Sequence, residues 1–181
     1  MNRIWVLGTA AILLSQSVAG VAQTGTPVHE QVEFSMETDI VPIEHPLVPP
    51  EPLMQVLTKD PLVAKVVRPC MKSADSPVEI PASWFVASEI RLAGPDEDDF
   101  VILPKNQCMN GVNVGPFWLV KKVHDDYQVI LSTGGHDLNV LPHRHNGHRD
   151  VEVLSATASE EFRVIFSFDG KSYQKVSVQT H

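Results

Sequence analysis

Residues 137–178 read DLNVLPHRHNGHRDVEVLSATASEEFRVIFSFDGKSYQKVSV and contain four short runs in which apolar and polar residues alternate. An alternation with a period of two is typical of β-strands that bury one face. The pairs Asn146-Gly147 and Asp169-Gly170 lie between runs and tolerate the positive φ angles of a tight hairpin turn. We therefore expect antiparallel strands, joined by these turns, over 137–142, 149–156, 161–168 and 172–178.

The same pattern continues upstream of this segment. It predicts further strands over 84–92, 100–103, 117–123 and 127–132, with the small residues 133–135 forming a corner. In the first of these strands one face carries Trp84, Val86, Ile90 and Leu92. In the run 161–168 one face is expected in the core, and it carries Phe162, Val164, Phe166 and Phe168. Tyr173 is expected to pack against Phe168.

Helices are expected only near the N-terminal side of this β-rich region. Nine of the 14 prolines lie between Pro42 and Pro81, and proline disfavours central strands because it has no N–H to donate. Asp60-Pro61 is a helix start, with an acidic N-cap followed by proline in the first turn. The fold class we predict is α+β and mostly β: a small antiparallel β-sandwich or curled barrel with one or two short N-terminal helices.

The first 22 residues have the features of a secretory signal peptide. Arg3 precedes an apolar stretch over 4–14, which is too short to span a membrane, and Gly20-Val21-Ala22 supplies small residues for cleavage after Ala22. We therefore expect an exported protein, periplasmic or secreted, with no membrane span after cleavage. Residues 23–50 are expected to form an extended proline-containing lead with an edge strand near Gln31–Met36, and residues 51–181 a single β-rich domain with a helical cap at 51–68.

The chain has two cysteines, Cys70 and Cys108, which enter an oxidising compartment if the protein is exported. An even pair in that setting predicts one disulfide between them, and the alternative is two unpaired thiols. Two cysteines in 181 residues exclude a disulfide-dense toxin or growth-factor scaffold.

The formal net charge of −8 disfavours nucleic-acid binding, which needs a basic face. Loss of Arg3 with the signal peptide makes the mature chain more acidic still. An acidic protein favours partners of basic character, so we expect the partner to be a protein or envelope component of that kind.

The densest chemical feature is LPHRHNGHRD at residues 141–150. Residues two apart on a strand share a face, so His143 and His145 are expected side by side, with His148 approaching across the Asn-Gly turn. Converging neutral imidazoles suit Zn²⁺ or Cu²⁺, and the alternative is a solvated loop that happens to be rich in histidine. These three histidines are the candidate metal ligands.

The sequence has no G-x-S-x-G nucleophile elbow, no H-E-x-x-H and no glycine-rich phosphate loop. We therefore expect a non-catalytic protein without a cofactor that binds a macromolecular or cell-envelope partner. Two alternatives stay open: a metal-binding protein that uses the histidines, and a small exported hydrolase whose site is assembled only by the fold.

Four segments between residues 84 and 175 carry a resemblance: Gly94–Glu97, Gly111–Trp118, Asn146–Asp150 and Phe166–Tyr173. They resemble exported bacterial proteins of unknown function that have an N-G-Y-R-D-like strand start and a C-terminal Y-x-F-D-G-x-x-Y-like hairpin. This sequence departs from that pattern at His148 and Phe166, where the pattern has tyrosine. The resemblance implies a bacterial, exported, β-rich protein and implies no activity. The pattern does not include His143 or His145.

Overall fold

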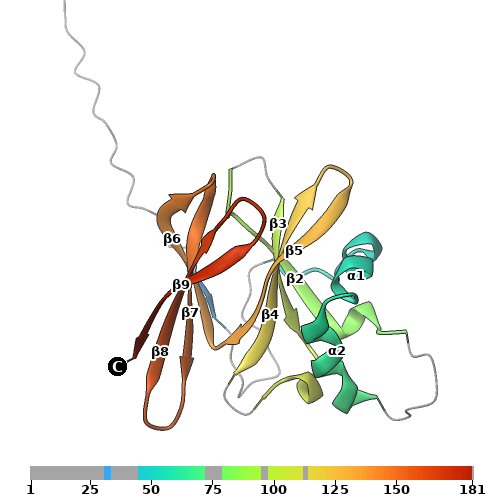
Figure 1. Cartoon of the computed structure of the whole chain (residues 1–181). Helices are drawn as coiled ribbons and strands as arrows, with labels where there is room; N and C mark the ends of the chain where they lie inside the picture. The colour runs from blue at the N-terminus through green and yellow to red at the C-terminus, as the bar shows by residue number, and fades with distance from the viewer. Residues whose placement is uncertain (1–30, 34–44, 72–78, 95–97, 112–113, 181) are drawn as a thin grey trace, which may run out of the picture.

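In a computed structural model the chain forms two antiparallel β-sheets and a small helical layer (Figure 1). The structure describes residues 31–33, 45–71, 79–94, 98–111 and 114–180. The predicted signal peptide with its cleavage site at Ala22, and most of the predicted lead over 23–50, lie outside these ranges. In the described part of the chain, no helix has the length and apolar character needed to cross a membrane.

The nine strands within the described residues are divided between two sheets, with the orders β1-β6-β7-β8-β9 and β2-β3-β4-β5. The first sheet contains β1 Gln31–Glu33, β6 Asp137–His145, β7 His148–Ala156, β8 Glu161–Phe168 and β9 Tyr173–Thr180. The second contains β2 Phe85–Ile90, β3 Asp99–Pro104, β4 Gly115–Val123 and β5 Asp126–Gly135. The predicted fold class is confirmed as a mostly β sandwich, with two separate sheets in place of a curled barrel. The expected edge strand is present over Gln31–Glu33, which pairs with β6.

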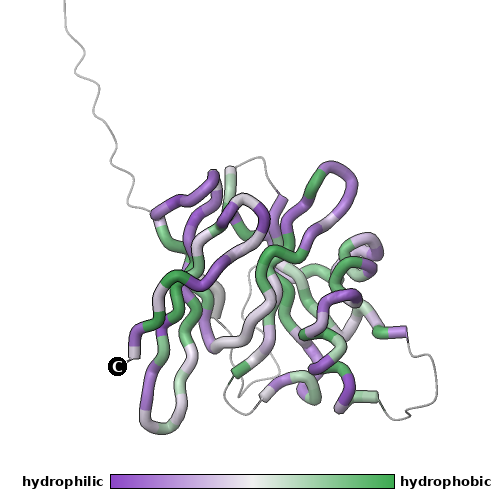
Figure 2. Tube along the Cα trace, in the orientation of Figure 1, coloured by the Kyte–Doolittle hydropathy of each residue, from purple (hydrophilic) through white to green (hydrophobic). Residues whose placement is uncertain are grey.

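The four-stranded sheet is the middle of three layers. Residues 115–120, the first six of β4, are all buried. Phe117 belongs to the core cluster between the two sheets, whereas its neighbour Trp118 belongs to the cluster beneath the helices. Successive side chains of a strand point to opposite faces, so a fully buried run needs cover on both sides. In Figure 2 the hydrophobic stretches accordingly gather where the layers meet, and hydrophilic ones occupy the outer hairpins.

Helices α1 Glu51–Leu57 and α2 Pro61–Val67 form the outer layer over this sheet. Asp60 connects the two layers. As predicted it is the N-cap of α2, where its Oδ1 accepts hydrogen bonds from the Leu62 amide at 2.9 Å and from Trp118 Nε1 at 3.0 Å. Its Oδ2 accepts a third, from Ser132 Oγ at 2.7 Å. One carboxylate thereby fixes the helix start to two strands.

Two local expectations were wrong. Trp84 ends the 3₁₀ turn Ala82–Trp84 and packs against the cluster beneath the helices, so it does not share the face of Val86. The expected corner at 133–135 is instead the end of β5, where Gly135 pairs with Gly115. A Cβ at Gly135 would lie 2.5 Å from a methyl group of Val153, so glycine lets the chain pass close to β7 there.

The predicted disulfide is confirmed between Cys70 and Cys108, whose Cα atoms lie 5.5 Å apart. It joins the 3₁₀ turn Arg68–Cys70, which follows α2, to the 3₁₀ turn Gln107–Met109, which follows β3. The helical layer is therefore tied covalently to the middle sheet.

Replacing Asp60 with alanine should destabilise the protein, because the N-cap of α2 is lost and the buried Trp118 N–H loses its acceptor. We expect a loss of about 2–4 kcal/mol in urea unfolding followed by tryptophan fluorescence. Asp60→Asn keeps one oxygen acceptor and should give an intermediate loss. An unchanged unfolding midpoint for Asp60→Ala would contradict this role.

The double variant Cys70→Ser/Cys108→Ser should lower the free energy of unfolding, since the bond closes a separation of 38 residues. The chain-entropy model gives about 4 kcal/mol for a loop of this size. The measurement is the denaturant midpoint of the variant against that of the oxidised wild type. Reduction of the wild type should reproduce the effect, and equal midpoints before and after reduction would show that the bond contributes no stability.

Candidate functional site

The candidate site lies on the hairpin of β6 and β7. Asn146 and Gly147 have positive φ angles of 47° and 86°, which confirms the tight turn expected from this pair. The turn pairs His145 with His148 and Arg144 with Arg149. The hairpin therefore places the residues at the end of β6 beside those at the start of β7.

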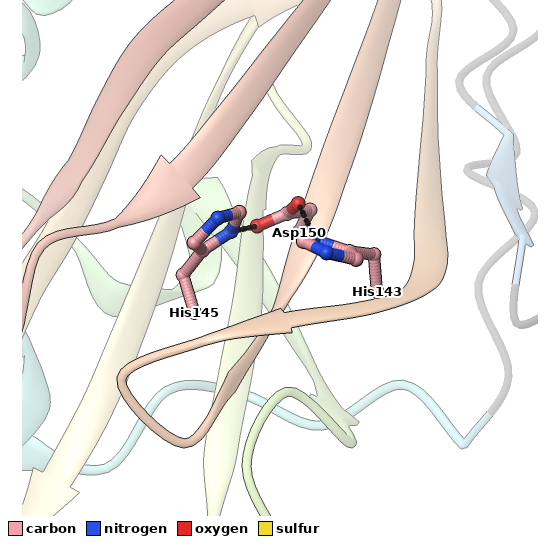
Figure 3. A group of neighbouring side chains, drawn as sticks. All are labelled: His143, His145 and Asp150. Atoms are coloured by element: carbon pink, nitrogen blue, oxygen red, sulfur yellow. Dashed lines mark hydrogen bonds and ion pairs between the residues drawn. The ribbon is translucent and has the colours of Figure 1, made fainter.

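His143, His145 and Asp150 form one cluster on this hairpin (Figure 3). The Asp150 carboxylate lies between the two rings, with Oδ2 2.9 Å from Nδ1 of His143 and Oδ1 2.8 Å from Nδ1 of His145. The rings meet edge to face with centroids 4.6 Å apart. The imidazoles are 67% and 47% exposed, while the carboxylate is only 7% exposed. The cluster thus combines a buried anion with two solvent-facing rings.

The structure brings together two of the three predicted metal ligands and places the third elsewhere. His148 is buried, and its ring stacks on Phe168 with the centroids 4.0 Å apart. Its Nε2 lies 3.4 Å from Nζ of Lys121 on β4. The ring is thus packed between the two sheets and is not part of the exposed cluster, although His148 pairs with His145 across the turn.

Asp150 takes the place that the sequence analysis assigned to His148. The turn itself contained the signal, because a two-residue loop sets the register of the whole hairpin. Continued by one pair beyond Arg144 and Arg149, a regular ladder would put His143 opposite Asp150, although the β6–β7 register shifts between Val140 and Arg144. Counting across the turn, in addition to along β6, would have made this carboxylate a candidate.

Two titratable groups at the cluster have pKa values that their surroundings shift. Burial by itself would raise the pKa of Asp150, but hydrogen bonds from His145, His143 and Ser167 outweigh it and hold that pKa below its ordinary value. Burial raises the pKa of the Tyr173 hydroxyl, and the nearby Asp99 and Asp150 add to the effect. Asp150 is therefore a carboxylate, and Tyr173 a neutral donor, over the physiological range.

Two arginines hold the backbone around the cluster. Arg144 Nη1 donates to the carbonyl oxygens of Leu92, Ala93 and Gly147, of which the last lies at 2.8 Å. Arg149 Nε donates to the Leu141 carbonyl at 3.0 Å, where the β6–β7 register is irregular. The guanidinium groups satisfy carbonyls that the strand ladder leaves unpaired, so the hairpin is fixed to itself and to the turn after β2.

The two motif segments at the C-terminal end of the chain contact each other. Asn146 Nδ2 donates to the Phe168 carbonyl at 2.8 Å, and the Tyr173 hydroxyl donates to the Arg149 carbonyl at 2.6 Å. Tyr173 also packs against Phe168, as expected, with ring centroids 5.5 Å apart. These residues therefore join the β6–β7 hairpin to the β8–β9 hairpin.

A second surface lies along β8 and β9. Of the residues expected in the core, Phe168 is buried and Phe166 packs against the cluster between the sheets, but Phe162 and Val164 are only partly buried and lie outside that cluster. Val178 lies opposite Val164. Val176 and Val178 are 59% and 52% exposed. We name Phe162, Val164, Val176 and Val178 the β8–β9 strip.

An open cavity of about 400 Å³ lies between α2 and the β4–β5 pair. Its lining is mostly apolar and includes Leu62, Val66 and Met109, with Lys65 as the charged side chain. None of the predicted site residues lines it.

Comparisons with protein-family models, with curated proteins and with solved structures found no match to this chain.

The hydrogen bonds to Asp150 make stability depend on pH. Because the pKa of this carboxyl is lower in the folded state, its stabilisation is complete above the unfolded pKa, near the ordinary value of 3.8, and is lost as the pH falls through the folded pKa. Asp150→Asn should therefore lower stability at pH 7 by about 1–3 kcal/mol and flatten its decline below about pH 4. Urea unfolding of both proteins in metal-free buffer between pH 2.5 and 7 measures this, and parallel curves would contradict it.

Proposed function

We propose that this is an exported, non-catalytic bacterial protein, periplasmic or secreted, that binds a macromolecular partner of the cell envelope. The observation that supports partner binding most directly is the β8–β9 strip. Monomeric proteins rarely leave several large apolar side chains together at the edge of a sheet, and such exposure is typical of interaction sites.

Export is supported by the N-terminal sequence pattern and by the disulfide. Disulfides persist in oxidising compartments and are rare in the cytosol, so the Cys70–Cys108 bond fits a periplasmic or extracellular location.

The occupant that best fits the strip is an extended segment of a partner protein. Among the described strands β9 pairs with β8 only, so its outer edge offers backbone N–H and C=O groups to a further strand. Lys175 is the single charge in the sequence of β9, YQKVSVQT, and its later half has none to repel a strand. The net charge of −8 favours a partner of basic character. Backbone pairing would supply affinity, and contact with Val178 and Phe162 would supply specificity.

Glutamates on the strip should abolish partner capture, because charges at Val176 and Val178 oppose both strand addition and apolar contact. The test uses three purified baits on envelope extract: wild type, Val176→Glu/Val178→Glu, and the matched control Ala158→Glu/Ser159→Glu on the exposed β7–β8 loop. We expect a partner retained by wild type and control at 0.5 M salt but lost from the strip variant. Photo-crosslinks from position 178 should then reach an extended segment of that partner.

Three results would contradict the proposal. One is equal capture by all three baits, and another is capture that a salt wash removes entirely. The third is a dimer in light scattering that dissociates only in the strip variant, since it would assign the strip to a second copy of this chain.

A further inference from the structure

We propose that His143, His145 and Asp150 form a binding site for one divalent transition-metal ion of the Zn²⁺ and Cu²⁺ class. This site is independent of the proposed partner surface, since it lies on the β6–β7 hairpin and uses no residue of the β8–β9 strip. It also differs from the histidine trio expected from the sequence, because the carboxylate of Asp150 replaces the imidazole of His148.

The ligand atoms already lie close to the positions that an ion needs. One ligand atom from each residue lies within 4.8 Å of the other two. In a tetrahedral site with bonds of about 2.0–2.1 Å, neighbouring ligand atoms are about 3.3 Å apart. The distances of 2.8 and 2.9 Å join the two Nδ1 atoms to different oxygens of the carboxylate. The Nδ1 that faces the coordinating oxygen would therefore move away from it by about half an ångström, and the other ring would turn toward the ion.

The parts that must move are the exposed ones. Asp150 is buried on β7, where its carboxylate is fixed, whereas the two imidazoles are about half exposed or more and can turn about their own bonds. The backbone beneath them is held by Arg144 and Arg149, whose guanidinium groups are bound to backbone carbonyls. A rigid frame with two adjustable rings lets an ion bind without refolding of the hairpin.

The proton balance also permits the ion to replace the hydrogen bonds between the imidazoles and the carboxylate. Where a neutral ring donates Nδ1–H to the carboxylate, the ion takes the Nδ1 lone pair and the ring changes to the tautomer that has its proton on Nε2. The proton passes through solvent, and this change of tautomer releases none. The single negative charge of Asp150 then compensates half of the ion's charge within the protein.

The donor set selects the class of ion. Two imidazoles and one carboxylate match the nitrogen-rich sites of Zn²⁺ and Cu²⁺, whereas Ca²⁺ and Mg²⁺ prefer oxygen ligands throughout. Three protein ligands leave at least one position for water, and the exposure of both rings places that position on the solvent side. The order of affinities among divalent ions predicts tighter binding of Cu²⁺ than of Zn²⁺.

The test is calorimetric titration of the full exported protein, prepared without a histidine tag and stripped with chelator, at pH 7.5. We expect one Zn²⁺ or Cu²⁺ per chain with micromolar or tighter affinity and no heat with Ca²⁺ or Mg²⁺. His143→Ala, His145→Ala and Asp150→Asn should each weaken binding at least tenfold. The EPR spectrum of the Cu²⁺-loaded protein should show hyperfine structure from two nitrogens.

Two variants discriminate this site from other histidines. His124→Asn removes an exposed turn histidine whose φ of 58° asparagine tolerates, and it should bind metal like wild type. His148→Phe removes the third histidine of the sequence pattern and should also retain binding, with circular dichroism confirming its fold. Loss of binding in His148→Phe with retention in Asp150→Asn would overturn the assignment. Absence of binding at 100 µM metal, or equal binding by all variants, would overturn the site.

Discussion

The burial of β4 on both faces is the constraint on which the rest of the structure depends. Phe117 and Trp118 are neighbours in sequence and both fully buried, yet they belong to different hydrophobic clusters. A strand in this position cannot face water on either side, so one sheet and one helical layer must both be supplied by other parts of the chain. The N-terminal helices are therefore part of the fold and cannot be regarded as an accessory to a two-layer sandwich.

Polar groups hold these layers in register at two places. On the helical side, Asp60 caps α2 and accepts from Trp118 and Ser132, while the Cys70–Cys108 bond ties down the end of the same layer. On the other side, Arg144 and the Arg149 amide reach the carbonyl of Leu92 and join the β6–β7 hairpin to the middle sheet. Directional hydrogen bonds of this kind specify one arrangement of layers that apolar burial by itself leaves open.

The two candidate functional surfaces lie where this layered packing ends. The five-stranded sheet continues past the cluster between the sheets, so Phe162 and Val164 are left partly uncovered. The β6–β7 hairpin ends in a turn whose outer side carries two exposed imidazoles over a buried carboxylate. Both surfaces are built on strands that the core holds rigidly, which favours recognition without large rearrangement.

Local chemistry determines most of the secondary-structure elements of this chain. Asn146-Gly147 can form a tight turn at little cost, Asp60-Pro61 starts a helix, and alternating apolar residues favour strands. Each of these signals acts within a few residues, and the structure has the turn, the helix start and the strands that they predict. The cysteine pair was predictable because only two thiols were present. The histidine pair was also predictable, since His143 and His145 are two residues apart on one strand.

The tertiary structure alone decided which faces are covered and which groups meet. The packing of His148 against Phe168, the contact of Trp84 with the helical side and the exposure of Phe162 all depend on elements that lie far apart in sequence. The alternation of apolar and polar residues along a strand indicates that its two faces differ in hydrophobicity. Which layer covers each face is set by the packing of the whole chain. The grouping of Asp150 with the two histidines lies between these cases, because a turn fixes the pairing while only the surrounding packing buries the carboxylate.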